Sequence, residues 1–465
     1  MTGRVALPVV HRAMGASPAT NIRQGQNTQE RSIGRQDSRQ PAPMLGPSER
    51  QLPKRRRRMA SVGSGLPEDI LSFEILVLLP VKCLVRLQLV CKLWRATITS
   101  THFAHRHLER SRSKFSFLLM PRRDNEDYSY GIKGVSIFSF EPEQLPTKIA
   151  PFLMHKGLRM PMFTLPLHCD GLILIPCLFG RIFVCNPATR EFVQLPPGSG
   201  HISLQCRVAF GFDPSSGKYK VARHFFRSCS ETIDAAGKST VVEHDAGHEV
   251  LTLGGDDQES LSWRATVDPP YPIIARTPAC LPGFFYWSAL HSLTGHGDDK
   301  VRSHVILRFN LRDETFTVHP NPPCRGFRST YDMLCEIGGK LGYIYSNSQR
   351  DAEIWLAEDD GKDLAWSLRC RICLPVPRQI RLHCCPSADQ DKVFLSVDTS
   401  HLFKCNLRDG TLEEIVDMAR KMKYADHEGK LFTSGELLVS HYMLRCVESL
   451  LRISPSENEQ LACTS

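Results

Sequence analysis

Two groups of side chains in this sequence have the types and spacing that could do chemistry. The first is Cys370 and Cys373, followed by His383, Cys384 and Cys385. Paired cysteines near a histidine can hold zinc when tight turns present both pairs. The segment around the first pair, RCRICLPVP, alternates as a β-strand does, which places Cys370 and Cys373 on opposite faces. We therefore expect no metal site here, and we expect no cofactor elsewhere in the chain.

A second group, GFDPSSGKY at residues 211–219, is similar to the loop that binds nucleotide phosphates. The spacing from Gly211 to Gly217 is one residue too long for such a loop. Tyr219 also stands where a Ser or Thr would bind magnesium. The hydrolase pattern G-x-S-x-G and the peptidase pattern H-E-x-x-H are absent from the sequence. These observations predict a protein without catalytic residues.

The charge distribution sets the first 60 residues apart from the rest. They carry 12 Lys and Arg against 3 acidic residues, which accounts for the whole net charge of +9 and leaves the remaining chain neutral. Their Gln, Arg, Ser, Pro and Gly content predicts a disordered basic tail at residues 1–60. A neutral remainder gives no overall basic bias for nucleic-acid binding, so no nucleic-acid partner is expected.

The tail ends in a run of five cations that could serve as a nuclear import signal, namely Lys54, Arg55, Arg56, Arg57 and Arg58. A solvated charge run without a receptor and an Arg-rich transit peptide are the alternatives. Met59 begins MASVGSGLPED, which would itself make an ordinary protein start. We therefore expect the preceding residues to be dispensable for the core function.

The remaining composition indicates the compartment. Apolar residues make up 42% of the chain, but no run reaches the roughly 18 residues of a membrane helix. The first residues, MTGRVALPVVHRAMG, lack the apolar core of a signal peptide. The 17 cysteines are scattered through apolar segments, as expected of reduced thiols. These features predict a soluble protein of the nucleus, the cytoplasm or both, with no membrane partner.

Residues 66–111 form a compact region that should be helical. The acidic start LPED suits a first helical turn, and Pro80 ends one helix and begins the next. Between residues 80 and 98, eight apolar side chains recur at helical steps but do not keep to one face. A segment this short cannot bury all of them. The spacing alone leaves open what covers the remaining apolar face; if all of it were core, neighbouring helices should be found nearby in the sequence. His102, His105 and His107 should lie at the surface.

From residue 115 to about residue 455 the sequence changes to short β-type segments separated by turn residues. Four segments place Asn or Asp six residues before an aromatic residue or Leu, as hairpin tips do: NPATREF (186–192), DPSSGKY (213–219), NLRDETF (310–316) and NLRDGTL (406–412). A strand, an acidic loop and a Trp recur at residues 249–263 and 353–366. This order of repeats predicts a β-propeller, and a plain antiparallel sandwich is the alternative.

The repeats also predict which side chains are buried. The aromatic residues that flank the tips should lie in the blade cores, namely Phe192, Tyr219, Phe316, Trp263 and Trp366. The acidic tips should be exposed, should tolerate substitution and could carry recognition, namely Asp256, Asp257, Asp359 and Asp360.

The helical region resembles the F-box, a module that docks onto the Skp adaptor of cullin-based ubiquitin ligases. The resemblance lies in LPEDIL, EIL, LLPVK, LVRL and above all VCKLWR. The β-rich region resembles the F-box-associated propeller domain of plant-type F-box proteins, in segments such as CDGLILI, VCNPATREFVQLP, PGFFYW and EIWLAEDD. These resemblances imply an α+β multidomain protein: a small helical F-box at residues 64–111, followed by an all-β propeller-like domain at residues 115–455.

The resemblance further implies a non-catalytic substrate-recognition subunit of an SCF-type ubiquitin ligase. Its F-box would bind the Skp adaptor and through it cullin, while its propeller would bind an unidentified target protein. The implied adaptor-binding residues are Leu66, Pro67, Ile70, Leu71, Ile75, Leu76, Leu79, Pro80, Val81, Leu84, Val85, Leu89, Val90, Cys91, Lys92 and Trp94. The alternatives are an intracellular protein-binding propeller without ligase function, an enzyme with its site in the propeller channel, and a nuclear nucleic-acid binder acting through the tail.

One feature departs from the family pattern. The stretch from Leu66 to Pro80 is one residue longer than usual, Ser72 is the candidate extra residue, and Leu78 replaces the usual Arg. One residue inserted into a helix rotates the preceding part by about 100°. Unless a bulge absorbs it, Leu66 to Leu71 should therefore meet the adaptor poorly.

Overall fold

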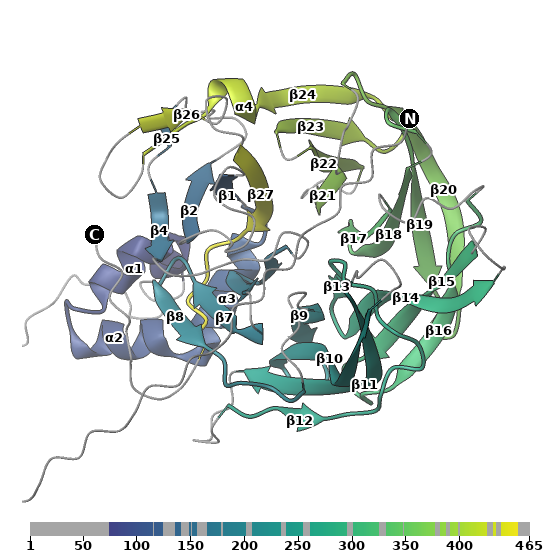
Figure 1. Cartoon of the computed structure of the whole chain (residues 1–465). Coiled ribbons are helices and arrows are strands. Elements are labelled where there is room, and N and C mark those ends of the chain that lie inside the picture. Colours follow the sequence, from purple (N-terminus) through teal and green to yellow (C-terminus); the bar gives the residue numbers. More distant parts are fainter. Residues whose placement is uncertain are drawn as a thin grey trace, which may run out of the picture. The chain divides into compact units, whose positions relative to one another are not determined.

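The computed structural model describes most of the chain after residue 73 (Figure 1). The described residues are 74–114, 116–123, 135–140, 148–149, 151–155, 165–177, 180–200, 207–233, 239–253, 261–294, 301–324, 332–346, 348–376, 382–386, 391–398, 400–425, 431–433 and 439–453. All of them belong to one compact unit, Gly65–Ser465. The basic tail, the stretch from Leu66 to Leu71, Ser72, Asp256 and Asp257 lie outside the described residues.

Short helical elements open the described structure: η2 (Leu76–Leu78), α1 (Val81–Leu87), α2 (Lys92–Thr99) and α3 (Thr101–Ser111). Pro80 precedes α1, where its fixed φ of −57° suits a helix start. The Cys91 Sγ accepts a hydrogen bond from the Trp94 N–H (3.4 Å) at the start of α2. Ser100 ends α2 and caps α3, because its Oγ accepts from the Phe103 N–H (3.3 Å).

The strands that follow form six four-stranded antiparallel sheets, which are called blades here. Blade 1 contains β27 (Val439–Cys446), β1 (Ser116–Arg123), β2 (Val135–Phe140) and β4 (Pro151–His155). Blade 2 contains β5 (Leu167–Cys169), β6 (Leu172–Pro176), β7 (Ile182–Asn186) and β8 (Glu191–Gln194). Blade 3 contains β9 (Arg207–Asp213), β10 (Lys218–Ile233), β11 (Ser239–Leu253) and β12 (Arg264–Ala265).

The strands of blade 4 are β13 (Ala279–Leu281), β14 (Phe284–Thr294), β15 (Val301–Asn310) and β16 (Phe316–Pro320). Those of blade 5 are β17 (Met333–Ile337), β18 (Lys340–Ser346), β19 (Asp351–Asp359) and β20 (Leu364–Cys373). Those of blade 6 are β21 (Leu382–Pro386), β22 (Lys392–Val397), β23 (His401–Asn406) and β24 (Leu412–Asp417). A short helix, α4 (Met418–Lys421), leads to a small sheet of β25 (Lys423–Ala425), β26 (Leu431–Thr433) and β3 (Lys148–Ile149).

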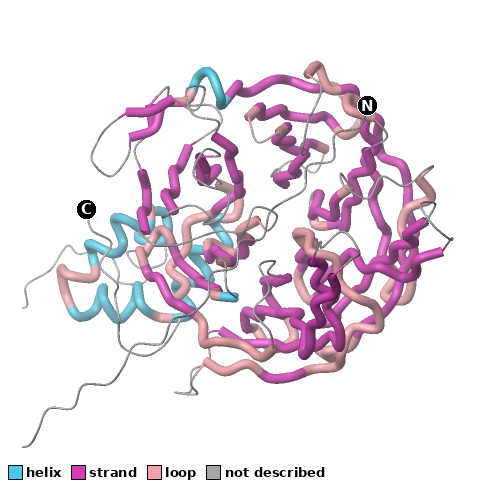
Figure 2. Tube along the Cα trace, in the orientation of Figure 1, coloured by secondary structure: helices cyan, strands magenta, loops and turns pink. Residues whose placement is uncertain are grey.

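The blades stand around a ring, and the helices gather at one side of it (Figures 1 and 2). The last strand closes the ring, because β27 pairs with β1 from Ser116↔Cys446 to Arg123↔Val439. Blade 1 thus joins both ends of the folded chain, and the predicted helical module followed by an all-β propeller is confirmed. The sandwich alternative is excluded by the closed ring.

A cluster of buried apolar side chains fills each interface between neighbouring blades. Strand β6 shows how one strand serves two interfaces. Leu172 and Leu174 pack toward blade 3, while Ile173 and Ile175 pack toward blade 1, and all four are fully buried. This follows from the alternation of side chains along a strand. A run that is apolar throughout therefore marks a strand that is covered on both faces.

The predicted hairpin tips are confirmed by their hydrogen bonds. Asn186, Asn310 and Asn406 each use Oδ1 to accept the backbone N–H two residues later, at 3.0, 2.8 and 3.0 Å. These three tips join the third and fourth strands of blades 2, 4 and 6. Asp213 accepts from the Ser215 N–H (2.9 Å) between β9 and β10. Each is a turn stabilised by its own side chain, as the repeats predict.

The two tryptophans of the repeat join neighbouring blades. The Trp263 Nε1–H donates to the Pro196 carbonyl (2.8 Å), and the Trp366 Nε1–H donates to the Pro320 carbonyl (3.1 Å). Burial is confirmed for Phe192 and Tyr219. It is wrong for Phe316, Trp263 and Trp366, which are half-buried. These three lie in or next to the outermost strands of blades 3, 4 and 5, and Phe192 is buried although it also lies on an outermost strand, β8.

The cysteine group of the sequence lies on strands. Cys370 is buried on β20, whereas Cys373 on the same strand is exposed, so the two thiols lie on opposite faces. In the described part of the chain, no three His, Cys, Asp or Glu side chains gather to hold a metal ion. No helix among the described residues combines the length and the apolar character needed to cross a membrane.

Two buried histidines predict how stability depends on pH. His224 and His248 face each other across β10 and β11, and burial lowers the pKa of each to about 3. The unfolded chain takes up these protons near pH 6.5. Stability should therefore be complete above pH 6.5 and fall below it, toward pH 3, by about 1.4 kcal/mol per pH unit for each histidine.

Denaturant titrations at pH 7 and pH 5 measure this loss. In His248→Gln the difference in unfolding free energy between the two pH values should be smaller than in the wild type. An unchanged pH dependence in His248→Gln would contradict the assignment.

Candidate functional site

The first two helices expose an unusual amount of apolar surface. Eight large hydrophobic side chains are exposed among the described residues, and six of them lie between residues 75 and 93. Leu89 is 88% exposed and Leu93 is 48% exposed. The six residues, which we call the apolar face, are Ile75, Leu78, Val85, Leu89, Val90 and Leu93. Apolar side chains exposed in this number within one short region indicate an interaction surface.

The periodicity of the helices determines which side chains form this face. On α1, Val81 and Leu84 are fully buried, whereas Val85, one position further on, is exposed. Residues 88–90 form a turn between α1 and α2. Leu89 and Val90 lie in this turn and are exposed. On α2, Ile98 points inward and Leu93 outward. The exposed apolar residues thus extend in sequence from just before η2 to the second residue of α2.

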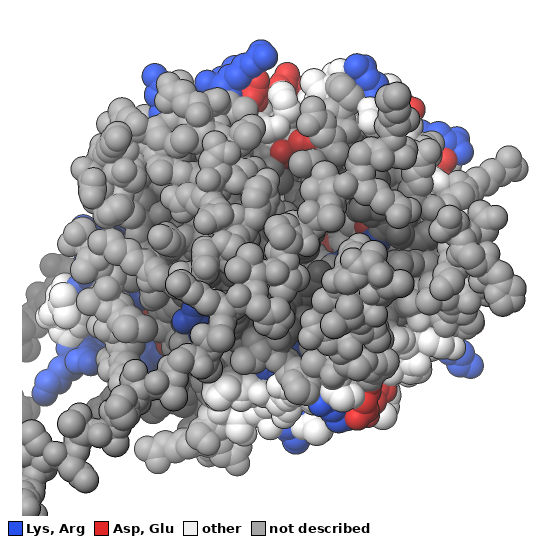
Figure 3. Space-filling view, viewed as in Figure 1, with Lys and Arg blue, Asp and Glu red and all other residues white. Residues whose placement is uncertain are grey.

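Exposed cations outnumber exposed carboxylates along these helices. Lys82, Arg86, Lys92 and Arg95, called the basic border here, are exposed, while residues 75–100 contain no Asp or Glu and the exposed Glu74 lies beside Ile75 in the sequence. Basic side chains are visible over α2 in Figure 3. An apolar face with such a basic border is complementary to a surface that carries both apolar and acidic groups.

The inner sides of the helices form a small core that holds the face in place. Its buried members are Leu76, Val77, Val81, Leu84, Ile98, Phe103, Ala104 and, from beyond the last strand, Leu450. His107 on α3 supports it, since its Nε2 lies 3.0 Å from the Leu79 carbonyl and its side chain is buried. The expectation that His107 lies at the surface is therefore wrong, because α3 packs on η2 through this side.

The sequence-predicted adaptor-binding residues fall into four groups. Leu66, Pro67, Ile70 and Leu71 lie outside the described residues. Ile75, Pro80, Val85, Leu89, Val90, Cys91 and Lys92 are exposed. Leu79 and Trp94 are half-buried, and Leu76, Val81 and Leu84 are buried in the small core. The exposed Leu78 and Leu93 are missing from the predicted set, although helical spacing from Ile75, Val85 and Leu89 could have pointed to them.

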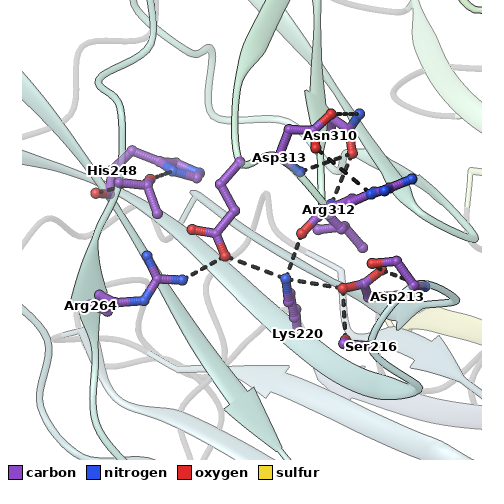
Figure 4. Close-up of polar contacts among 12 residues, drawn as sticks. Asp213, Ser216, Lys220, His248, Arg264, Asn310, Arg312 and Asp313 are labelled. Carbon is purple, nitrogen blue, oxygen red and sulfur yellow. Dashed lines mark hydrogen bonds and ion pairs between the residues drawn. The ribbon is translucent and has the colours of Figure 1, made fainter.

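The phosphate-loop-like segment, residues 211–219, lies at the turn between β9 and β10, and its Asp213 pairs with Lys220, the residue that follows the segment. Lys220 is buried, and its Nζ donates to the Leu311 carbonyl of blade 4 (Figure 4). The same Nζ lies 3.1 Å from an Asp213 carboxylate oxygen and 3.3 Å from a Glu314 carboxylate oxygen. Arg264 also pairs with Glu314, at 2.6 Å. These four charged residues, called the Lys220 cluster, join blades 3 and 4.

The pKa values of the cluster agree with this structural role. Burial alone would raise the pKa of Asp213, but hydrogen bonds from Ser215, Ser216 and Lys220 outweigh it and hold this pKa well below its usual range. Burial would likewise raise the pKa of Glu314, but Arg264 and Lys220 outweigh it and lower this pKa on balance. The Lys220 charge is thus matched by ionised carboxylates of its own chain.

One acidic tip, Asp359, is exposed as expected and also makes polar contacts with the neighbouring blade. Asp359 accepts hydrogen bonds from the Tyr286 hydroxyl (2.8 Å) and from the Arg308 guanidinium (2.7 Å), both of which are buried in blade 4. Burial opposes the shift, but the Gly361 N–H, Tyr286 and Arg308 together lower the pKa of Asp359. The neighbouring Asp360 is exposed and accepts only from the N–H groups of its own turn, at Lys362 and Asp363, in the contacts seen here.

The two aspartates should therefore respond differently to alanine. Asp359→Ala leaves the Arg308 charge and the Tyr286 hydroxyl without this partner, and should lower the unfolding free energy by about 1–3 kcal/mol. Asp360→Ala removes only a turn cap and should cost less than about 1 kcal/mol. Thermal melting of both variants measures the difference, and equal melting temperatures would contradict the inter-blade role of Asp359.

Family comparisons agree with this architecture. Residues 119–400 match the F-box associated beta propeller domain, and residues 64–106 match the F-box domain. The helical module with its apolar face, followed by a closed propeller, thus defines an F-box protein. The chain belongs to the family of F-box proteins that carry an F-box associated beta propeller domain.

Its relatives include F-box proteins of Arabidopsis thaliana. One is 27% identical over 334 residues, which cover 69% of this chain and 76% of the relative. Another is 29% identical over 321 residues, which cover 68% and 72%. Among solved structures, the crystal structure of the major Malassezia sympodialis allergen Mala s 1 has 9% identity and a TM-score of 0.33, covering 63% of this chain and 94% of that one. At that TM-score the likeness does not bear on function.

Proposed function

We propose that this protein is the substrate-recognition subunit of an SCF-type cullin ubiquitin ligase. The F-box would bind the Skp adaptor and through it cullin, and the propeller would bind a target protein. The observation that carries the proposal is the apolar face, which an F-box family member leaves uncovered. Burying each large side chain of this face would contribute about 1.5–3 kcal/mol before the cost of association.

The chain would act by proximity and would supply no catalytic side chain. Holding a target on the propeller, near a ubiquitin-charged enzyme brought in through cullin, raises the effective concentration of the reactants. The basic border of the apolar face favours an acidic adaptor surface. Such steering should make association faster at low ionic strength than at high ionic strength.

Binding of the purified full chain to the Skp adaptor tests the proposal. The two proteins should co-elute in size-exclusion chromatography, and cullin should join the complex. Ubiquitination of proteins captured by the propeller should then require both partners. A chain that captures targets but stays separate from the adaptor would instead be a protein-binding propeller without ligase function.

We also propose that the run from Lys54 to Arg58 directs the protein to the nucleus, because five adjacent cations suit an acidic receptor groove. A chain that starts at Met59 should bind the adaptor as the full chain does but should lose nuclear enrichment. Fluorescent fusions of the two chains measure this. An identical distribution in cells would show that the run is only a solvated charge cluster.

A further inference from the structure

The residues after the last strand lie between the helices and the propeller. Strand β27 ends at Cys446, and residues 447–453, called the C-terminal segment here, continue past α3 toward β7 and β8 (Figure 1). They carry no regular secondary structure, yet most of them are buried. Irregular backbone inside a protein needs specific polar partners and close packing. Both are present on the two sides of this segment.

On the helix side, the segment completes the F-box core. Leu450 is buried among Val81, Leu84, Ile98 and Phe103. Glu448 accepts a hydrogen bond from the Val81 N–H, with 2.9 Å between that nitrogen and Oε2. Pro80, at the N-cap of α1, offers no side-chain acceptor for this first N–H. A carboxylate 367 residues away in the chain therefore caps α1.

On the propeller side, the segment packs into the core between blades 2 and 3. Val447, Leu451 and Ile453 are buried in that cluster, and Leu108 of α3 belongs to the same cluster. The Asn186 Nδ2 donates to two carbonyls of the segment, those of Ser449 (3.0 Å) and Leu451 (2.9 Å). Asn186 is fully buried.

The sequence of the Asn186 tip explains why its amide is directed at the segment. In the related tips, the Nδ2 of Asn310 and of Asn406 donates to an aspartate three residues later, Asp313 or Asp409. The NPAT tip has Thr189 at that position, so no local carboxylate competes for the Asn186 amide. The same turn therefore carries a long-range contact in blade 2 and a local contact in blades 4 and 6.

A second link joins the helices to the propeller directly. The Arg112 guanidinium, just after α3, donates two hydrogen bonds to the Asp170 carboxylate of the β5–β6 turn, at 3.0 and 2.8 Å. Gly171 in that turn has a φ of +88°, and a Cβ there would lie 2.7 Å from the Ser449 Cβ. The turn thus needs glycine for two reasons: its backbone has a positive φ, and a side chain there would clash with Ser449 of the C-terminal segment.

We propose that the C-terminal segment couples the F-box to closure of the propeller, so that the two fold as one thermodynamic unit. Closure brings β27 onto β1 and places the next residues in the F-box core. Adaptor binding at the apolar face then stabilises the closed ring, and opening of the ring weakens adaptor binding. This reciprocal part rests on the proposed function, and it follows from linkage between two sites that share one folded state.

Two matched pairs of variants of the full chain test the coupling. Asn186→Asp keeps the Oδ1 acceptor of the turn but loses the donor to the segment, and Asn406→Asp is its control on an exposed tip. Glu448→Ala removes the cap of α1, and Glu448→Gln keeps an acceptor oxygen. Hydrogen exchange of the α1 to α3 amides is the first measurement. Exchange should be at least 10-fold faster in Asn186→Asp and in Glu448→Ala than in the two controls.

The second measurement is adaptor binding and its effect on exchange. Asn186→Asp should bind the Skp adaptor at least 10-fold more weakly, although Asn186 is buried away from the apolar face. In the wild type, the adaptor should slow exchange of the β27 and β1 amides. The coupling is overturned if α1 to α3 exchange at the wild-type rate in Asn186→Asp while β27 exchanges faster, or if a bound adaptor leaves β27 unchanged.

The two proposals fail in different ways. If the wild-type chain does not bind the adaptor, while Asn186→Asp and Glu448→Ala still accelerate exchange in α1 to α3, the ligase assignment fails and the intramolecular coupling stands. If the wild type binds the adaptor and both variants bind as tightly as it does with unchanged exchange, the ligase assignment stands and the coupling fails.

Discussion

Replacing Leu89 and Leu93 together by aspartate is expected to weaken binding of the Skp adaptor by at least about 100-fold. Each side chain would lose about 1.5–3 kcal/mol of burial at the interface, and each new carboxylate would resist transfer out of water. Both residues are exposed in the chain alone, at 88% and 48%, so the F-box core loses little. The melting temperature should therefore stay within a few degrees of the wild type.

Calorimetry of the double variant with the purified adaptor measures the effect. Val267→Asp is the control, since Val267 is also an exposed apolar residue, at 55%, but lies on the propeller. Leu84→Asp is a less informative variant, because Leu84 is fully buried and a charge there should unfold the helices. Wild-type adaptor affinity in the Leu89 and Leu93 double variant would remove the apolar face from the proposed interface.

Lys220→Met should lower the unfolding free energy of the propeller by about 3–5 kcal/mol. The substitution keeps the length of the side chain but removes the charge that Asp213 and Glu314 share, and Asp213 is 1% exposed. It also leaves the Leu311 carbonyl without this donor at the interface of blades 3 and 4. A buried carboxylate that loses its cation is among the costliest defects in a folded domain.

Denaturant unfolding of Lys220→Met can be compared with that of Lys340→Met. Lys340 pairs with Glu358, and both side chains are largely exposed, at 48% and 66%. An exposed pair contributes about 0–1 kcal/mol, so this control should unfold nearly as the wild type does. Equal losses in the two variants would show that the Lys220 cluster has no special role in joining the blades.

Short-range patterns made much of the fold predictable. The Asn of NPATREF or NLRDGTL encodes its own turn, so hairpin tips could be located without knowledge of the rest of the molecule. The apolar run of β6 is likewise a local pattern, typical of a strand covered on both faces. The Trp repeats indicated blades, although the acceptors of Trp263 and Trp366 lie in the preceding blade and could not be read locally.

What escaped prediction depends on contacts between distant parts of the chain. The family resemblance placed Leu84 and Val85 together among the expected adaptor-binding residues. In the structure Leu84 is buried against Phe103 and Leu450, whereas Val85 is exposed. The sequence indicates only a surface tip at Asp359, and its hydrogen bond from Arg308 becomes visible only in the structure. Glu448, which caps α1, is separated from Val81 by 367 positions in the sequence. A single sequence carries no local signal for such pairs.

The capping of α1 by Glu448 has a consequence for the timing of synthesis. Val81 and Glu448 are 367 residues apart, so at roughly 5–20 residues per second the ribosome adds the second one roughly 20 to 70 seconds after the first. Throughout that interval the nascent F-box lacks both its cap and Leu450. An adaptor that selects the ordered helices would therefore engage completed chains and pass over those still being made.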